Sequence, residues 1–387
     1  MKKLLRPIIA AGLSLAILAG CGGTAQAPSP VVSNEPVVSS EPVASSEPVV
    51  SKEPAVVQEA GNDNLYIAVV SKGFQHQFWQ TVKSGSDQAA IDFGVEVFFT
   101  GPEGESAIAD QVSMINAELA KNPDALALAA LSTESVISQL EEAYSKGIPV
   151  IGFDSGVPEA PAGQIAANAS TNNDEAAALG ATHMFEAIKD KVAEATAASP
   201  VVITVLSQDV TGASVQGRTR GFAAKMAELA EGVNSNGVAI KGGYNVINKG
   251  DAGSAAVIID VVVGATPDIT DMTNAASGLL NTPNLIGVFC SNEGAVNGLL
   301  AAINAGSKVP DGVQLVGFDA GSGQKAAIRS GVFLGSITQD PYQIGYKAVE
   351  LSVKAAKGES VSDIDTGAKW YDASNIDDPD IAVLVYD

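Results

Sequence analysis

Short apolar runs alternate with helical segments from Leu65 onward, and this alternation constrains the fold more than any other feature of the sequence. In the first half, the runs "LYIAVV", "VEVFFT", "ALALAA" and "PVIGFD" read as strands, and helices are predicted between them from about His76, near 106–121 and near 134–146. Parallel strands need crossover connections, which are usually helices. The pattern therefore predicts an α/β fold with a parallel sheet.

The alternation begins again after "GQIAANASTNN". Further strands are predicted at "VVITVLS", "VAIKGGYNV", "LIGVFC", "VQLVGFD" and "VFLGSITQ", with helices in the intervals. A chain of 387 residues is longer than one hydrophobic core usually supports. We therefore expect two Rossmann-like lobes, each with its own parallel sheet.

The first 63 residues lack this alternation. Residues 1–20, "MKKLLRPIIAAGLSLAILAG", combine a basic start, an apolar run and small residues, which is typical of a secretory signal peptide. Residues 31–54 are four hexapeptide copies, each ending in proline, and their small and acidic residues offer little surface to bury. We expect residues 21–63 to form a disordered linker rich in Pro, Glu, Ser and Val.

The sequence has two cysteines, and they have different expected roles. The stretch "LAGC", which ends at Cys21, resembles the lipobox of bacterial lipoproteins. This resemblance implies lipidation of Cys21, and acyl chains such as palmitate would anchor the protein to the outside of the cell membrane. Cys290 lies in the apolar run "LIGVFC" and is expected to fill core volume. We therefore expect no disulfide.

Charge and motifs exclude several classes of function. Acidic residues outnumber basic ones by 44 to 22 without a clustered basic stripe, so nucleic acid is not an expected partner. The two histidines are His76 and His183, and His183 is expected on a solvated helix face. Phosphate-binding loops, nucleophile turns and metal-binding His or Cys patterns are absent from the sequence. We expect no enzyme activity, no cofactor and no metal.

Polar residues directly after the predicted strands form the candidate site. In open α/β sheets, ligands bind beyond the carboxyl ends of the strands. The segments at those ends are "SKGFQHQFW", "DSG", "SQDVTGASVQGR", "SNEG" and "DAGSG". Carboxylates and amides suit neighbouring hydroxyl groups, and aromatic side chains suit the apolar face of a sugar ring.

These strand-end residues, the lipobox and the two-lobe pattern together look like a sugar-binding protein of a bacterial ATP-driven (ABC) importer. More narrowly, residues 64–387 resemble the ribose-binding-protein family of type I periplasmic binding proteins. The segments that carry the resemblance are "FWQTVKSGSDQAA", "NPDALALAAL", "GIPVIGFDSG", "GRTRGFAAKM", "GVFCSNEGAVNGLL", "LVGFDAGSGQKAAIRSG" and "GSITQDPYQIGYKAVE". The resemblance implies that the protein captures a monosaccharide between its lobes and delivers it to a membrane permease. We also expect a monomer.

The family's ligand-binding positions fall on nine residues of this sequence. In chain order these are His76, Phe78, Trp79, Asp154, Ser155, Gln216, Asn292, Asp319 and Gln339. Phe78 and Trp79 would be aromatic walls, although core packing is the alternative for each. Ser155 and Gln216 stand where ribose binders carry arginines, and Arg218 matches the next arginine of the motif. Ribose is therefore not favoured, and another pentose, a ketohexose or a related polyol remains open.

The resemblance also implies a hinge of three chain crossings, near 167–172, near Gln339 and near 361–364. The lobes would be 64–168 plus 340–362 and 169–339 plus 363–387. The segment 254–267 looks longer than the family needs, and no site residue is assigned there. A receptor of the same fold for a sugar-like quorum signal or for chemotaxis is the alternative function.

Overall fold

The computed structural model describes residues 64–74, 76–244 and 246–386. The expected signal peptide at 1–20, the lipidated Cys21 and the linker at 21–63 lie outside these described residues. Within them, no helix combines the length and the apolar character that crossing a membrane requires.

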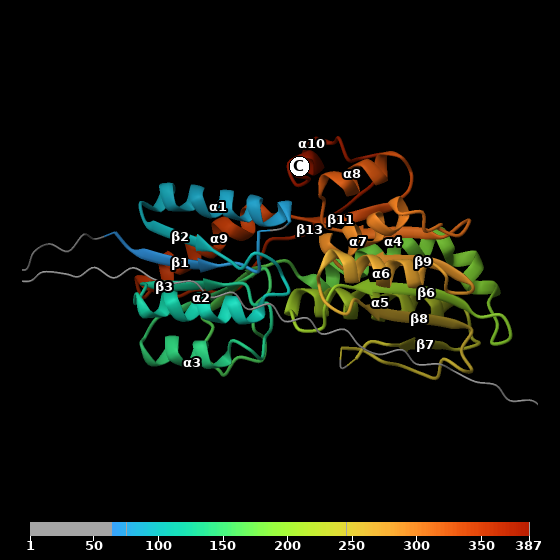
Figure 1. The fold of residues 1–387 in the computed structure, drawn as a ribbon, viewed down its shortest axis with the longest axis horizontal. Helices are drawn as coiled ribbons and strands as arrows, with labels where there is room; N and C mark the ends of the chain where they lie inside the picture. The colour runs from blue at the N-terminus through green and yellow to red at the C-terminus, as the bar shows by residue number, and fades with distance from the viewer. Residues whose placement is uncertain (1–63, 75, 245, 387) are drawn as a thin grey trace, which may run out of the picture. The chain divides into compact units, whose positions relative to one another are not determined.

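The first lobe is built on a parallel sheet of six strands in the described part of the chain, in the spatial order β12-β5-β4-β3-β1-β2 (Figure 1). Its strands are β1 (Tyr66–Val70), β2 (Glu96–Thr100), β3 (Ala125–Leu128), β4 (Val150–Phe153), β5 (Ala167–Ser170) and β12 (Ile364–Asp365). Helices α1 (Gln77–Phe93) and α9 (Pro341–Ala356) cover one face, and α2 (Ile108–Ala120) and α3 (Ile137–Ser145) cover the other.

Both faces of the central strands β1, β3 and β4 are buried, which explains their continuous apolar runs. Ile67 and Val69 of β1 pack toward α1 and α9, whereas Ala68 and Val70 pack toward α2 and α3. Successive side chains of a strand point to opposite faces, so a strand covered on both sides needs apolar residues at every position.

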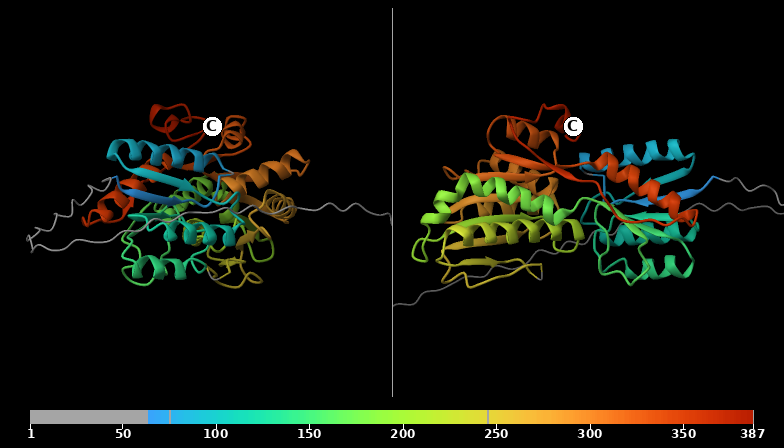
Figure 2. Two further views of the ribbon diagram at one scale, coloured as in Figure 1. Left: turned by 60° about the vertical axis from the view of Figure 1, so that its left-hand side comes forward. Right: turned by 180° about the vertical axis from the view of Figure 1, so that it is seen from behind.

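The second lobe has a seven-stranded sheet among the described residues, in the order β13-β11-β10-β9-β6-β8-β7. Its strands are β6 (Val201–Ser207), β7 (Val238–Lys241), β8 (Val257–Val263), β9 (Leu285–Cys290), β10 (Gln314–Phe318), β11 (Gly335–Gln339) and β13 (Ala368–Tyr371). Helices α4 (Asn173–Glu194) and α5 (Ala213–Val233) pack on one face. On the other lie α6 (Ile269–Leu279), α7 (Glu293–Asn304), α8 (Ser322–Arg329) and α10 (Pro379–Ala382). Figure 2 shows the sheets and the helices that cover them from two further directions.

The α/β prediction with two mostly parallel sheets is confirmed, and three details differ. Strand β8 lies within the segment 254–267, where no strand was predicted, and it pairs in parallel with β6 and β7. Strand β13 runs antiparallel to β11. His183 is half-buried rather than solvated, because its ring stacks on Trp370 with centroids 4.0 Å apart.

The chain passes between the sheets at three places. It leaves the first sheet after Ser170, returns after Gln339 and leaves again after Asp365. The third crossing, expected near 361–364, follows β12, and residues 364–365 belong to the first sheet.

Two glycines let α1 and α9 approach each other closely. A Cβ atom on Gly85 would lie 2.0 Å from the Tyr342 carbonyl oxygen, and one on Gly345 would lie 1.9 Å from the Val82 carbonyl oxygen. Helix α1 ends at Gly94, whose φ of 63° is left-handed. This packing fixes the first turn of α1, which carries part of the candidate site.

Candidate functional site

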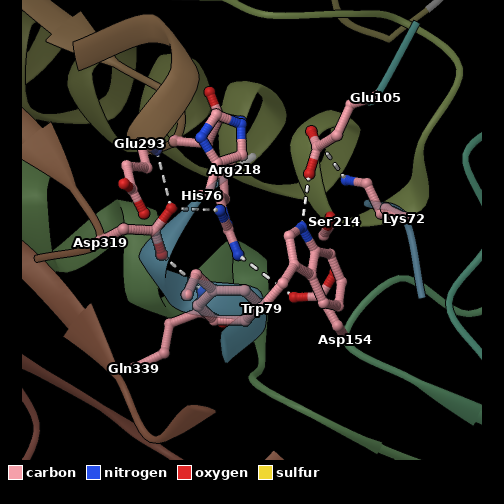
Figure 3. Close-up of a pocket in the computed structure, with 12 residues that line it drawn as sticks. Lys72, His76, Trp79, Glu105, Asp154, Ser214, Arg218, Glu293, Asp319 and Gln339 are labelled. Carbon is pink, nitrogen blue, oxygen red and sulfur yellow. Dashed lines mark hydrogen bonds and ion pairs between the residues drawn. The ribbon is translucent and has the colours of Figure 1, made fainter. Parts of the chain in front are cut away.

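A cavity lies between the two lobes, at the carboxyl ends of their strands. Its lining comes from the segments after β1, β2, β4 and β10, from the end of β11 and from the amino-terminal turns of α1, α5 and α7. The lining residues are Lys72, His76, Phe78, Trp79, Glu105, Asp154, Ser214, Arg218, Asn292, Glu293, Asp319 and Gln339. Figure 3 draws these side chains as sticks and labels all but Phe78 and Asn292. The location is the one expected for ligands of open α/β sheets.

Two aspartates face this cavity from opposite lobes. Asp154 directly follows β4 and Asp319 directly follows β10, within the matching sequences "GFDSG" and "GFDAG". Both have left-handed backbone conformations, with φ of 52° and 72°. Aspartate tolerates this region better than most residues do. The equivalent turns aim one carboxylate from each lobe at the same space.

Arg218 lies between these carboxylates. Its Nη2 atom is 4.0 Å from Asp154 Oδ1, and its Nη1 atom is 3.5 Å from Asp319 Oδ2. The guanidinium also donates to Asn173 Oδ1 at 2.7 Å and lies 3.9 Å from the ring centre of Phe318. Arg218 is 3% exposed, so these interactions form away from bulk water.

Asp319 is also held by neutral donors. Its Oδ1 accepts a hydrogen bond from Gln339 Nε2 at 2.7 Å, and its Oδ2 accepts one from the backbone N–H of Glu293 at 2.9 Å. That N–H belongs to the first residue of α7, whose N-cap is Asn292. The orientation of Asp319 is therefore set before any ligand arrives.

A second charged pair lies at the first-lobe side of the cavity. Lys72 Nζ is 3.9 Å from Glu105 Oε2, and both side chains are about 4% exposed. The other oxygen of Glu105 accepts a hydrogen bond from Trp79 Nε1 at 2.8 Å. The cavity thus brings together two cationic side chains, Lys72 and Arg218, and four carboxyl groups.

Burial and charge set the ionisation of these groups. Burial raises the pKa of Asp154 to about 6, even though Lys72 and Arg218 act to lower it. Burial also raises the pKa of Glu293. Burial alone would lower the pKa of Lys72 and raise that of Glu105, but their mutual attraction and neighbouring charges reverse both shifts. Lys72 and Glu105 are therefore both charged at neutral pH.

The aromatic residues of the site also belong to the core. Phe78 and Trp79 are 5% and 1% exposed and pack in the same cluster as Phe153. Their rings meet edge to face at 5.0 Å. The two predicted roles, cavity wall and core packing, therefore coincide here.

Seven of the nine predicted residues line the cavity, and Ser155 and Gln216 do not. Ser155 is fully buried, and its Oγ accepts a hydrogen bond from the backbone N–H of Ser214 at 3.3 Å. Gln216 lies on α5 between Ser214 and Arg218, which do line the cavity. Residues four apart share a helix face, whereas the residue midway between them points elsewhere.

Five cavity residues were not among the nine predicted positions. They are Lys72, Glu105, Ser214, Arg218 and Glu293. Lys72 lies just after β1, and Ser214 and Glu293 lie in the first turns of α5 and α7, so the strand-end rule could have identified these three. Arg218 lies in the second turn of α5, and Glu105 lies within the connection between β2 and α2. Burial of a charged side chain cannot be read from the sequence without knowledge of its partner.

The lobes also touch each other around the cavity. Ser106 Oγ donates to Asp268 Oδ1 at 2.9 Å, and the backbone N–H of Ser322 donates to Gln77 Oε1 at 3.0 Å. The space between the atoms is about 280 Å³ including the open mouth, but the centre of a water molecule can reach only about 20 Å³. A sugar ring would therefore require the lobes to separate and Arg218 to move from its position between the aspartates.

A family model and a curated protein that are similar to this chain both describe periplasmic binding proteins. Residues 67–360 match the family model described as a periplasmic binding protein domain. The D-allose-binding periplasmic protein of Escherichia coli is 23% identical over 310 residues, which cover 78% of this chain and 88% of that protein.

Two solved structures are also similar. One, described as an ABC transporter and LacI family transcriptional regulator from Brachyspira murdochii, is 42% identical with a TM-score of 0.70, covering 84% of this chain and all of that one. The other is an ABC transporter solute binding protein from Agrobacterium vitis with bound D-fucose. It is 25% identical with a TM-score of 0.69, covering 83% of this chain and all of that one.

Proposed function

The chain belongs to the periplasmic binding protein family, and we propose that it binds a monosaccharide between its two lobes for delivery to the permease of an ABC importer. The observation that carries this proposal is the pair of equivalent aspartates, Asp154 and Asp319, which face one cavity from opposite lobes. Family membership makes the chain a binding protein rather than an enzyme and implies an extracytoplasmic location.

The proposed lobes follow the sheets. We take the first lobe as 64–170 plus 340–365 and the second as 171–339 plus 366–386, which moves two of the expected boundaries slightly toward the C-terminus. Opening and closing would rotate the lobes about the three crossings. We also propose that it acts as a monomer, because both lobes that face the cavity belong to the same chain.

The cavity favours a polyhydroxylated ligand. Carboxylates and the Gln339 amide oxygen accept hydrogen bonds, while Lys72 and Arg218 donate them, and sugar hydroxyls can do both. Of the predicted site residues, we propose His76, Phe78, Trp79, Asp154, Asn292, Asp319 and Gln339 as ligand contacts. The ligand class we favour is a pentose, a ketohexose or a related polyol.

A thermal-shift screen tests this function. The panel would contain D-ribose, D-arabinose, D-allose, D-fucose, D-fructose and D-tagatose. A sugar at about a hundredfold excess over its Kd stabilises the folded protein by about 2.7 kcal/mol, so at least one is expected to raise the Tm by several degrees. Glycerol at equal concentration is the control. A panel in which no sugar raises the Tm more than glycerol does would contradict sugar capture.

We also propose that a lipid on Cys21 keeps the protein at the membrane, with 21–63 as its tether. Support comes from the apolar run of 1–20, the small residues before Cys21 and the proline-containing repeats. Mass spectrometry of the protein extracted from membranes is expected to show an amino-terminal cysteine that carries acyl chains. An unmodified Cys21 would exclude the anchor without affecting the sugar-binding proposal.

A further inference from the structure

Lys72 and Glu105 face each other in the cavity without a direct hydrogen bond between their charged groups. Their nearest charged atoms are 3.9 Å apart, which is too long for a hydrogen bond. Glu105 Oε2 is buried and has no hydrogen-bond partner, while Oε1 is occupied by Trp79 Nε1. A buried acceptor without a partner is costly, so the geometry of this pair indicates a group that is supplied from outside the chain.

The chemistry of the gap restricts that group. It must accept a hydrogen bond from an ammonium and donate one to a carboxylate. A hydroxyl does both, because it carries one donor hydrogen and two lone pairs. A ligand ammonium could satisfy Glu105 but would be repelled by Lys72, and a ligand carboxylate would have the opposite problem. A water molecule can fill the gap in the absence of ligand.

We propose that Lys72 and Glu105 together bind one hydroxyl of the captured sugar and so select for its presence. This inference rests on the proposed sugar-binding function and adds a specificity-determining pair to the site. A hydroxyl oxygen to one side of the line that joins the two charged atoms, about 2.8 Å from each, would accept from Lys72 Nζ and donate to Glu105 Oε2.

The position of the pair suits this role. Lys72 and Glu105 lie at the side of the cavity opposite Asp319 and Gln339, with Trp79 beside them (Figure 3). Trp79 holds Glu105 through its indole N–H, which fixes the carboxylate in place. A ring against Trp79 would be held at one end by Asp319 and Gln339 and at the other by this pair. Gln339 Oε1 is a second buried hydrogen-bond acceptor without a partner. The cavity therefore has one such oxygen at each end, Glu105 Oε2 and Gln339 Oε1.

The inference is tested with Glu105→Gln and Lys72→Met by calorimetry, using the panel sugar that gives the largest thermal shift and its monodeoxy analogues. Glu105→Gln keeps an acceptor for Trp79 Nε1, and Lys72→Met keeps most of the side-chain volume. Losing a hydrogen bond to a charged group weakens binding roughly 10- to 150-fold. We expect each variant to lose that much affinity for the parent sugar.

The analogues distinguish contact with a hydroxyl from a general effect on cavity shape. In the wild-type protein, one monodeoxy analogue is expected to bind about as weakly as the parent sugar binds Glu105→Gln, and the variant should bind that analogue and the parent sugar nearly equally. If the variants bind the parent sugar as tightly as wild type, the inference is wrong. It is also wrong if Glu105→Gln weakens the parent sugar and every analogue by the same factor.

A matched control is Glu118→Gln on α2. Glu118 is also a buried carboxylate of the first lobe, but it bonds Tyr66 Oη at 2.6 Å at the amino end of β1, away from the cavity. Its substitution is expected to leave sugar affinity unchanged. If the wild-type protein binds no sugar of the panel, the proposed function fails and this inference fails with it. Normal wild-type binding with unaffected variants overturns the inference alone.

Discussion

Arg218→Met is expected to lower the affinity for the sugar by roughly 10²- to 4 × 10³-fold, because breaking a buried charge pair costs about 3 to 5 kcal/mol. The guanidinium lies between Asp154 and Asp319, which come from different lobes. Closing the lobes without it would bring two buried carboxylates together with Lys72 as the remaining lysine or arginine of the cavity lining. Calorimetry with the sugar identified by the thermal-shift screen measures the loss.

Helix α5 provides a matched control two residues away. Arg220 pairs with Asp174 at 2.6 Å, but both side chains are more than 40% exposed. Exposed pairs contribute little, so Arg220→Met is expected to change the affinity by less than about twofold. Unfolding curves of both variants separate loss of binding from loss of fold. Equal sugar affinity in the two variants would mean that Arg218 only supports the structure.

The sheets could be predicted from the sequence because their central strands are covered on both faces. A run such as "LYIAVV" lacks the alternation of apolar and polar residues that is typical of a strand with one face in solvent. Together with the helical segments between the runs, this predicts a parallel sheet. Strand β8 was missed for the same reason, since periodicity alone does not distinguish a long apolar run from a buried helix. Its one acidic residue, Asp260, pairs with Lys241 of β7, a contact that becomes visible only once the strands are placed.

Site residues could be predicted from the sequence where they lie directly at the end of a predicted strand. Asp154, Asp319 and Gln339 directly follow or end a strand, and all three reach the cavity. Glu105 could not be identified in this way, because its role depends on Lys72 and Trp79 from other parts of the chain. Gln216 does not line the cavity, because the helical phase of α5 directs Ser214 and Arg218, rather than Gln216, toward it.

Asp154→Asn is expected to stabilise the sugar-free protein near neutral pH while weakening sugar binding. Burial disfavours the ionised carboxylate in the absence of ligand, and Asp319 and Glu105 add repulsion. Asparagine also tolerates the left-handed backbone at this position, so the substitution removes charge without new strain. Losing a charged acceptor is expected to weaken sugar binding at least tenfold. Such a trade between stability and function is typical of binding sites.

The stabilisation should depend on pH in a defined direction. The carboxyl group of Asp154 has a pKa near 3.8 in the unfolded chain and about 6 in the folded protein. Between these values the folded protein holds a proton that the unfolded chain has released. The free energy of unfolding therefore falls as the pH rises through this window, by about 3 kcal/mol in total.

The amide introduced by Asp154→Asn does not titrate, so the free energy of unfolding of this variant relative to wild type is expected to rise by about 3 kcal/mol from about pH 4 to about pH 7 and to stay level above that. Urea unfolding without sugar, repeated across this range, measures the difference. The exposed Asp174→Asn serves as the control, because its carboxylate is more than 40% exposed and lies outside the binding cavity. Parallel pH profiles for Asp154→Asn and wild type would show that burial does not hold a proton on Asp154.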